Sequence, residues 1–237
     1  MKKIAILSIA VSVLFLQSCI IALENSVSGD GEVTTEVIDI DNFTGVHVSS
    51  GIDVTLEQGD FNVVVEADEN LHEYITVEKE GKMLRVGSER SIRHAKSKVV
   101  HVTLPELTDI RISSAGDVDA VSDFKCDDLD VDISSAGDLK IGVKADDVSI
   151  SISSSGDCDI WGSANSLDAR LSSAGDLNAF DLEADYVKVR ASSAGDASVT
   201  ANKEVDMSAS SAGNIYYKGD ARVVHSSTSS AGNIVHR

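Results

Sequence analysis

Five aspartates recur at a nearly constant interval in the second half of the chain, and such a series of carboxylates could bind cations. Each directly follows the glycine of a Ser-Ser-Ala-Gly or Ser-Ser-Ser-Gly tetrapeptide. The five are Asp117, Asp138, Asp157, Asp176 and Asp196. If the copies stack, unit charges about 5 Å apart repel by on the order of 1 kcal/mol even in water. Bound Ca²⁺ would offset this repulsion, because calcium prefers flexible carboxylate oxygens.

The alternative is that each aspartate only hydrogen-bonds its own turn, as asparagine does equally well. Two later copies carry Asn214 and Asn233 at this place, which favours the alternative. We therefore expect no cofactor, with calcium as the one ion to test.

Two aromatic residues, Trp161 and Phe180, each stand five residues after a motif glycine. If each copy forms one coil of a stack, the two rings lie on adjacent coils and face outward. They could form a platform for a sugar ring or for an apolar patch of a partner protein. The alternative is that both rings pack under a turn at the edge of the coil.

The charge of the chain is strongly acidic, with a formal net charge of −19. This field argues against a nucleic-acid partner. The basic residues are unevenly placed, because 7 of the 20 lie between Lys79 and Lys98. That segment could bind an acidic glycan or lipid headgroups, or it could be a solvated hairpin.

The sequence contains no recognisable catalytic motif. The histidines lack the His-Glu-x-x-His spacing of zinc enzymes, and no Gly-x-Ser-x-Gly nucleophile motif occurs. Seven near-identical copies of one motif also do not suit a single active site. We expect a protein that is not an enzyme, with a polysaccharide-acting enzyme as an alternative on the analogy of fold alone.

The N-terminus has the features of a leader that is removed. Lys2 and Lys3 precede an apolar run from Ile4 to Leu16, which is too short to span a bilayer. The following Gln-Ser-Cys resembles the cleavage site of bacterial lipoproteins, in which Cys19 becomes the acylated first residue and carries palmitate or a similar chain. This predicts a membrane partner through the lipid anchor. The alternative is an ordinary secretory signal in which Cys19 is incidental. Removal of residues 1–18 leaves 18 basic and 39 acidic residues, a formal net charge of −21.

A repeat of about 19 residues organises the rest of the chain. The motif glycines follow one another at intervals of 21, 19, 19, 20, 18 and 19 residues, and they are Gly116, Gly137, Gly156, Gly175, Gly195, Gly213 and Gly232. Apolar and polar residues alternate on both sides of each glycine, which is typical of half-buried strands. A unit this short has room for two or three strands and their turns, but not for an added helix. We predict an all-β fold, a single parallel β-helix with one repeat per coil and about ten coils.

The repeat also predicts which side chains face inward, because alternate residues of a strand face the same way. Positions eight, six and four before the glycine are aliphatic, as in Leu129, Val131 and Ile133. The serine two before the glycine, such as Ser135, is predicted to join them as an inward or corner ladder of hydroxyls. The glycine itself is predicted to require either a positive φ or a close backbone approach. Cys126, Ala145 and Ala164 each stand three residues before the first inward aliphatic residue and are predicted to form a small column of the core. Cys158 is also predicted to be a core residue.

We divide the chain into three parts: a leader over residues 1–18, a flexible tether over 19–32, and one domain over 33–237. Within this domain, irregular coils are expected over 33–109 and regular coils over 110–237. Only five residues follow Gly232, so the last coil has an open strand edge. We expect self-association through this C-terminal end.

Two stretches carry a resemblance to a known family: "FTGVHVSSGIDVTL" from Phe43 to Leu56, and the Ser-Ser-Ala-Gly-Asp repeats that follow "VTLPEL". With its leader, the chain resembles the bacterial family described as putative auto-transporter adhesin, head GIN domain, common among lipoproteins of Bacteroides-like organisms. The resemblance implies a right-handed β-helix and an envelope location. It transfers no catalytic residue.

From these features we expect a non-enzymatic, lipid-anchored protein of the outer membrane, on a face that the sequence leaves open. It would act as an adhesin or binding module for a glycan or another envelope protein. A structural or envelope-stress-linked periplasmic component is a further alternative.

Overall fold

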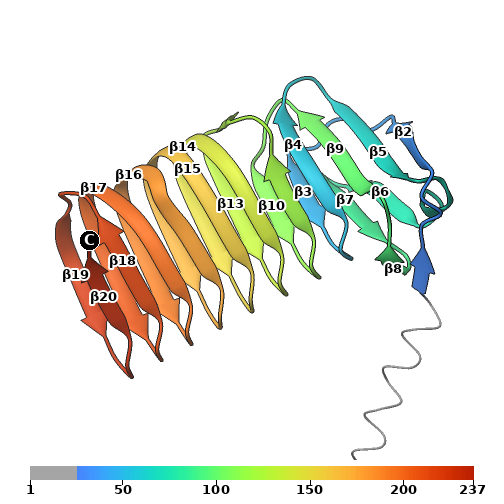
Figure 1. Ribbon diagram of the computed structural model, residues 1–237. Coiled ribbons are helices and arrows are strands. Elements are labelled where there is room, and N and C mark those ends of the chain that lie inside the picture. The colour runs from blue at the N-terminus through green and yellow to red at the C-terminus, as the bar shows by residue number, and fades with distance from the viewer. Residues whose placement is uncertain (1–25) are drawn as a thin grey trace, which may run out of the picture.

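The computed structural model describes residues 26–237 as one elongated stack of strands, with β2 at one end and β19 and β20 at the other (Figure 1). Eighteen strands form a single sheet that winds around the stack, and β1 and β8 form a separate pair. The turns number about seven, fewer than the ten predicted, and the predicted parallel β-helix is confirmed. Within residues 26–237, no helix is long and apolar enough to span a membrane.

The regular half is built from parallel strands in register. Asp138 lies opposite Asp157, and Ile150 lies opposite Ala169, as expected if each repeat forms one coil. The strands of this half are β10 (Asp109–Ile112), β11 (Asp117–Ala120), β12 (Phe124–Lys125), β13 (Asp128–Ile133), β14 (Asp138–Ile152), β15 (Asp157–Leu171), β16 (Asp176–Ser192), β17 (Asp196–Ser210), β18 (Asn214–Lys218), β19 (Arg222–Thr228) and β20 (Asn233–His236).

The core of the regular half consists of the predicted aliphatic columns. Leu129, Val131 and Ile133 are buried, and so are their counterparts on the following coils. Burying such a side chain contributes roughly 1.5–3 kcal/mol, so each coil stabilises the next through contacts between neighbouring columns. Cys158 is fully buried among these residues, as predicted.

The turns at the motif decide between the two alternatives predicted for the second serine, an inward ladder or a corner. Ser135 has a φ of 57° and Ala136 a φ of 62°, and both are exposed. The serine two before the glycine is therefore not inward, because two successive left-handed residues form a turn that carries it out of the strand. The amide of Gly213 donates to the carbonyl of Ser210 at 2.9 Å, which closes one such turn. This geometry resembles a type I′ turn.

The motif glycines serve close packing rather than a positive φ. Gly137 is buried, and none of the seven motif glycines has a positive φ. A Cβ on Gly137 would lie 2.4 Å from Cγ2 of Ile112 on the preceding coil. The left-handed conformation falls instead on serine and alanine, at a cost of roughly 1–2 kcal/mol per residue. Backbone bonds between coils offset this cost, such as the 3.1 Å bond from the Ala115 amide to the Ser135 carbonyl.

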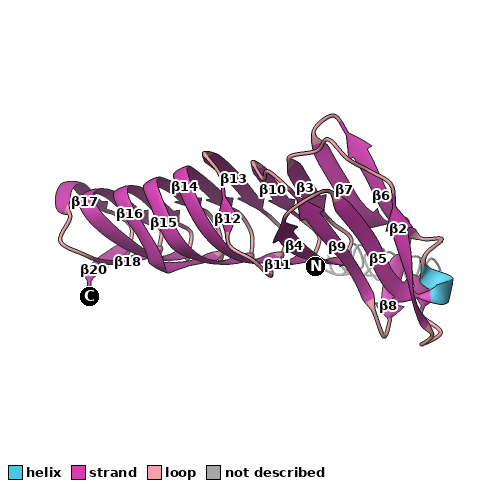
Figure 2. Cartoon of the chain, turned by 90° about the horizontal axis from the view of Figure 1, so that it is seen from above, coloured by secondary structure: helices cyan, strands magenta, loops and turns pink. Residues whose placement is uncertain are grey.

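The N-terminal half has a mixed topology. β3 and β4 continue the parallel stack by pairing with β10 and β11. In contrast, β2 and β9 both pair antiparallel with β5, and β6 pairs antiparallel with β7. Figure 2 shows these strands as a broader block at one end of the narrow regular coils. The prediction of irregular coils over 33–109 is therefore wrong for the antiparallel strands.

The elements of this half are β1 (Ser26–Ser28), β2 (Val33–Ile38), β3 (Gly45–Val48), β4 (Asp53–Gln58), β5 (Asn62–Asp68), a three-residue 3₁₀ helix (Glu69–Leu71), β6 (Ile75–Glu80), β7 (Met83–Ser88), β8 (Ser91–His94) and β9 (Lys98–Leu104). The β6–β7 hairpin carries Lys79 and Arg85, so the interpretation of the basic segment as a hairpin holds for its first part. Arg93 lies instead in β8, which pairs in parallel with β1.

A buried carboxylate holds the segment before β2 in place. Asp68 is 1% exposed and accepts bonds from the backbone amides of Gly31 at 2.9 Å, Lys96 at 3.0 Å and Ser97 at 3.0 Å. Desolvation acts to raise the pKa of Asp68, but these backbone bonds prevail and lower it. β1 also pairs with β8. Residues 26–32 of the predicted tether are thus docked on the domain.

Candidate binding surface

The five predicted aspartates form one column along the stack. Each is the first residue of a strand. Asp138 lies between Asp117 and Asp157 in the parallel ladder. The structure adds Asp53, which lies opposite Asp117 and forms a 3.3 Å ion pair with Lys98. The Ser49-Ser50-Gly51 copy of the motif could have identified Asp53, because it stands two residues after that glycine.

The aspartates of this column repel one another. Burial and the neighbouring Asp53 and Asp138 raise the pKa of Asp117. Burial and the neighbouring Asp138 and Asp176 raise the pKa of Asp157 in the same way. At the far end, the Asn214 amide nitrogen donates to Asp196 at 2.6 Å, so an uncharged donor replaces a further carboxylate.

No metal site is preformed in this column. In the part of the chain that the structure describes, no three His, Cys, Asp or Glu side chains are grouped so that they could hold a metal ion. Calcium binding by the column stays a prediction.

Trp161 and Phe180 lie on neighbouring coils, but each ring contacts a different partner. The Trp161 indole nitrogen donates to Asp123 at 3.2 Å, and the ring covers the bare backbone of Gly142. The Phe180 ring lies 4.0 Å from the Lys218 ammonium nitrogen. Trp161 is 37% exposed, so part of its ring is open to a ligand. Ligand binding by these rings stays a prediction.

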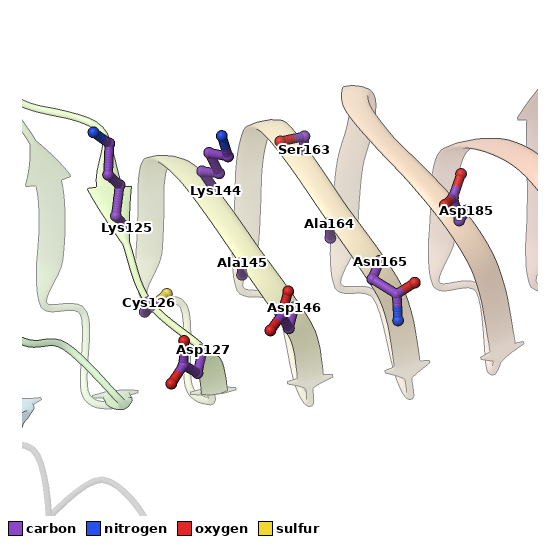
Figure 3. A pocket seen from close by; sticks show the side chains of 10 residues that line it. All are labelled: Lys125, Cys126, Asp127, Lys144, Ala145, Asp146, Ser163, Ala164, Asn165 and Asp185. Atoms are coloured by element: carbon purple, nitrogen blue, oxygen red, sulfur yellow. The ribbon is translucent and has the colours of Figure 1, made fainter.

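An open groove of about 520 Å³ crosses the coils between Lys125 and Asp185. Figure 3 shows Lys125 and Lys144 on one side of the groove, and Asp127, Asp146 and Asn165 on the other. Its floor consists of three small residues, Cys126, Ala145 and Ala164, which had been predicted only as a small column of the core. The groove exists because this column carries no large side chain.

The charged side chains of the groove are not paired with one another. Lys125 and Lys144 form no ion pair with any acid among residues 26–237. In contrast, Lys140 lies 4.0 Å from Asp119, and Arg170 lies 2.8 Å from Asp168. The groove therefore presents both ammonium donors and carboxylate acceptors to solvent.

A second groove of about 280 Å³ adjoins the first. Its lining residues Ser166 and Tyr186 directly follow Asn165 and Asp185, which line the first groove. Tyr186 is 44% exposed and lies beside Asp168, Lys188 and Glu204. The sequence analysis missed this tyrosine. Its place opposite Ser166 in the ladder, on an outward face, is the signal that could have found it.

The two cysteines among the described residues are Cys126 and Cys158, and both are free thiols. Burial, with the nearby Asp127 and Asp128, raises the pKa of the Cys126 thiol. Burial, with Asp159 and Asp157, raises the pKa of the Cys158 thiol as well. Neither environment favours a reactive thiolate. Cys19, the predicted acylation site, lies outside the described residues.

The C-terminal end of the stack has an exposed last coil. All residues of β19 are exposed, including Val223 and Val224. β19 pairs with β17 and β20 pairs with β18, and within the described chain neither strand has a further partner at its outer side.

Solved structures share this architecture. A crystal structure described as a putative adhesin from Bacteroides fragilis has a TM-score of 0.82 and 19% identity, covering 89% of this chain and 99% of its own. A putative adhesin from Parabacteroides distasonis has a TM-score of 0.72 and 24% identity, covering 90% and 100%. A structure described as a putative lipid binding protein from the same species has a TM-score of 0.70 and 22% identity, covering 89% and 99%.

At these identities, the likenesses establish the fold alone. No curated protein sequence matches the chain significantly. The family and its structural neighbours carry the descriptions of adhesins or binding proteins rather than enzymes. The description of the family indicates a protein of the cell envelope or surface. The match of the family to residues 42–221 covers most of the chain, which therefore belongs to the family described as "putative auto-transporter adhesin, head GIN domain".

Proposed function

We propose that the protein is a lipid-anchored binding module of the outer membrane, and that it binds a glycan in the two adjoining grooves. The observation that carries this proposal is the first groove, where Lys125, Lys144, Asp127 and Asp146 face solvent without pairing. Sugar hydroxyls donate to carboxylates and accept from ammonium groups, so a glycan can satisfy both sides at once. Membership of an adhesin-type family supports the same assignment.

The repeat also suits a chain-like ligand. Equivalent positions recur at the strand spacing of about 4.8 Å, so successive sugar units would meet successive coils. Tyr186 lines the second groove, and Trp161 stands two residues before Ser163 of the first groove. Both rings are partly exposed and can contact sugar rings through their faces. A protein partner would instead be expected to bury roughly 800 Å² of the surface of this chain.

The groove can be tested with immobilised bacterial and host polysaccharides as probes. The chain should retain at least one of them. The double variant Lys125→Gln and Lys144→Gln should weaken that retention by about 100-fold or more, since each lost charged hydrogen bond removes roughly 1.5–3 kcal/mol. Lys140→Gln is the matched control, because Lys140 pairs with Asp119 outside the groove. Equal loss in the control, or no retention by wild type on any probe, would contradict the proposal.

Anchoring requires a separate test on whole cells. Wild type should incorporate labelled palmitate and fractionate with membranes, whereas Cys19→Ser should do neither. Protease treatment of intact cells, with a periplasmic protein as control, then distinguishes the two faces of the outer membrane. Digestion of the protein supports an adhesin that meets external ligands, whereas protection would direct the search to glycans and proteins of the periplasm.

The open last coil supports a second proposal, association of two copies through the C-terminal end. An unpaired strand edge with adjacent apolar side chains readily accepts another strand. Val223 is 43% exposed and Val224 45% exposed. Sedimentation should reveal a concentration-dependent dimer that Val223→Asp with Val224→Asp abolishes, whereas Val37→Asp at the opposite end leaves it intact. A strictly monomeric profile at high concentration would refute this association.

A further inference from the structure

If Cys19 carries a lipid, the anchor would join the domain at β1. Only residues 20–25 separate Cys19 from β1. Six extended residues span at most about 20 Å. β1 is paired with β8, and the amide of Gly29 donates to the carbonyl of His94 at 2.7 Å. If Cys19 is acylated, the β1–β8 end of the stack is therefore held within about 20 Å of the lipid.

The same end carries an unusual run of charge. From Arg90 to Lys98 the sequence contains four basic residues and no acid, although the chain as a whole has a net charge of −19. Arg90, Arg93 and Lys96 are exposed. We call these three residues the basic edge.

The basic edge is not neutralised by acids of the domain. None of its three side chains forms an ion pair with an acid in residues 26–237. The Arg90 guanidinium lies 4.9 Å from the centre of the Tyr74 ring, and the Lys96 nitrogen donates to the Gly31 carbonyl at 3.4 Å. Neither contact involves an acid, although the charge of Lys96 also helps to lower the pKa of the buried Asp68.

We propose that the basic edge binds anionic lipid headgroups and so sets the orientation of the stack on the membrane. The inference rests on the proposed anchor at Cys19 for its proximity, and on the unpaired charges for its chemistry. The acidic coils are repelled by the same surface, which favours contact through this end alone. The opposite end, with β19 and β20, then lies away from the lipid (Figure 1).

Vesicle flotation of a chain that begins at residue 20 tests this surface without the anchor. Every described strand is retained in that chain. At low salt it should bind vesicles of phosphatidylglycerol and phosphatidylcholine more tightly than vesicles of phosphatidylcholine alone. Each basic residue near an anionic surface strengthens binding by about fivefold, so the triple variant Arg90→Glu, Arg93→Glu and Lys96→Glu should lose about 100-fold or more.

The matched control carries Lys125→Glu, Lys144→Glu and Lys218→Glu, which change the net charge equally but lie on the regular coils. It should bind clearly better than the triple variant. Equal binding of the two variants, or no preference of wild type for the anionic vesicles, would overturn the inference. Because this chain lacks Cys19, its result is independent of acylation, and the palmitate test separately decides whether the anchor exists.

Discussion

The regular coils and the N-terminal block bury their aliphatic side chains equally well but hold their strands together differently. In the coils, every strand from β13 to β17 meets the next in parallel, with register shifts between β15 and β16 and between β16 and β17, so contacts are between neighbouring repeats. In the block, β5 lies between β2 and β9 and joins segments far apart in sequence. The coils thus depend on a repeated local fit, whereas the block depends on single, unrepeated contacts such as those of Asp68.

The largest effect is expected where the repeated fit is tightest. Gly137→Val should destabilise the protein by about 3 kcal/mol, because its Cβ would lie 2.4 Å from Cγ2 of Ile112 and the coils would have to separate. Urea unfolding monitored by circular dichroism measures this loss. Ala136→Gly, one residue away on the exposed turn, should leave stability unchanged or slightly raised. Similar losses in both variants would mean that the turn, not the glycine packing, is the sensitive element.

A smaller and more local effect is expected in the N-terminal block. Asp68→Ala removes the carboxylate that accepts the amides of Gly31, Lys96 and Ser97, so residues 26–32 should detach while the coils remain folded. Limited proteolysis should cut this segment much faster, with little change in the unfolding of the coils. Asp60→Ala, at an exposed acid, is the control. Loss of the whole fold in Asp68→Ala would contradict the division between the two regions.

The pH dependence of this docking follows from the lowered pKa of Asp68. A carboxyl whose folded pKa lies below its unfolded value stabilises the fold above the unfolded pKa, and the contribution is lost as pH falls through the folded pKa. Cleavage near residues 26–32 should therefore accelerate only in strong acid.

The smallest effect is expected along the aspartate column. The pKa of Asp157 is raised, so its charge destabilises the fold at neutral pH, and this penalty disappears as pH falls through the folded value. Asp157→Asn should stabilise the protein by less than about 1 kcal/mol at pH 7, because the carboxylate is exposed and screened. Thermal melting at pH 7 and in acid should show a gain only at the higher pH. Asp168→Asn, which breaks a 2.8 Å ion pair with Arg170, should give the opposite sign.

The sequence predicted the coils because a fixed period places like residues in columns, and burial of Leu129, Val131 and Ile133 follows from alternation alone. Alternation could not be carried through the turn, since Ser135 and Ala136 are both left-handed and reverse the chain. In the block, the strand patterns were visible, but a pattern does not say that β5 runs antiparallel to β9.

The candidate site was only partly predictable for a related reason. The small column of Cys126, Ala145 and Ala164 was found, but its consequence, an open groove, depends on the long side chains beside it. Those side chains come from coils of unequal length, so Lys125 and Lys144 stand at different distances from their motif glycines, nine and seven residues. Trp161 and Phe180 occupy equivalent positions in their repeats, five residues after the motif glycine. Their rings nevertheless contact different polar neighbours, Asp123 and Lys218.

The stacking of equivalent repeats makes the length of the molecule adjustable in whole units. Asp117, Asp138 and Asp157 occupy equivalent places, so removing residues 138–156 would bring Asp157 opposite Asp117 with the same turn and the same glycine packing. Neither end of the stack would be altered. Gene duplication or deletion of one repeat can therefore lengthen or shorten the distance between the two ends of the stack by about 4.8 Å, while the surfaces of the two ends stay intact.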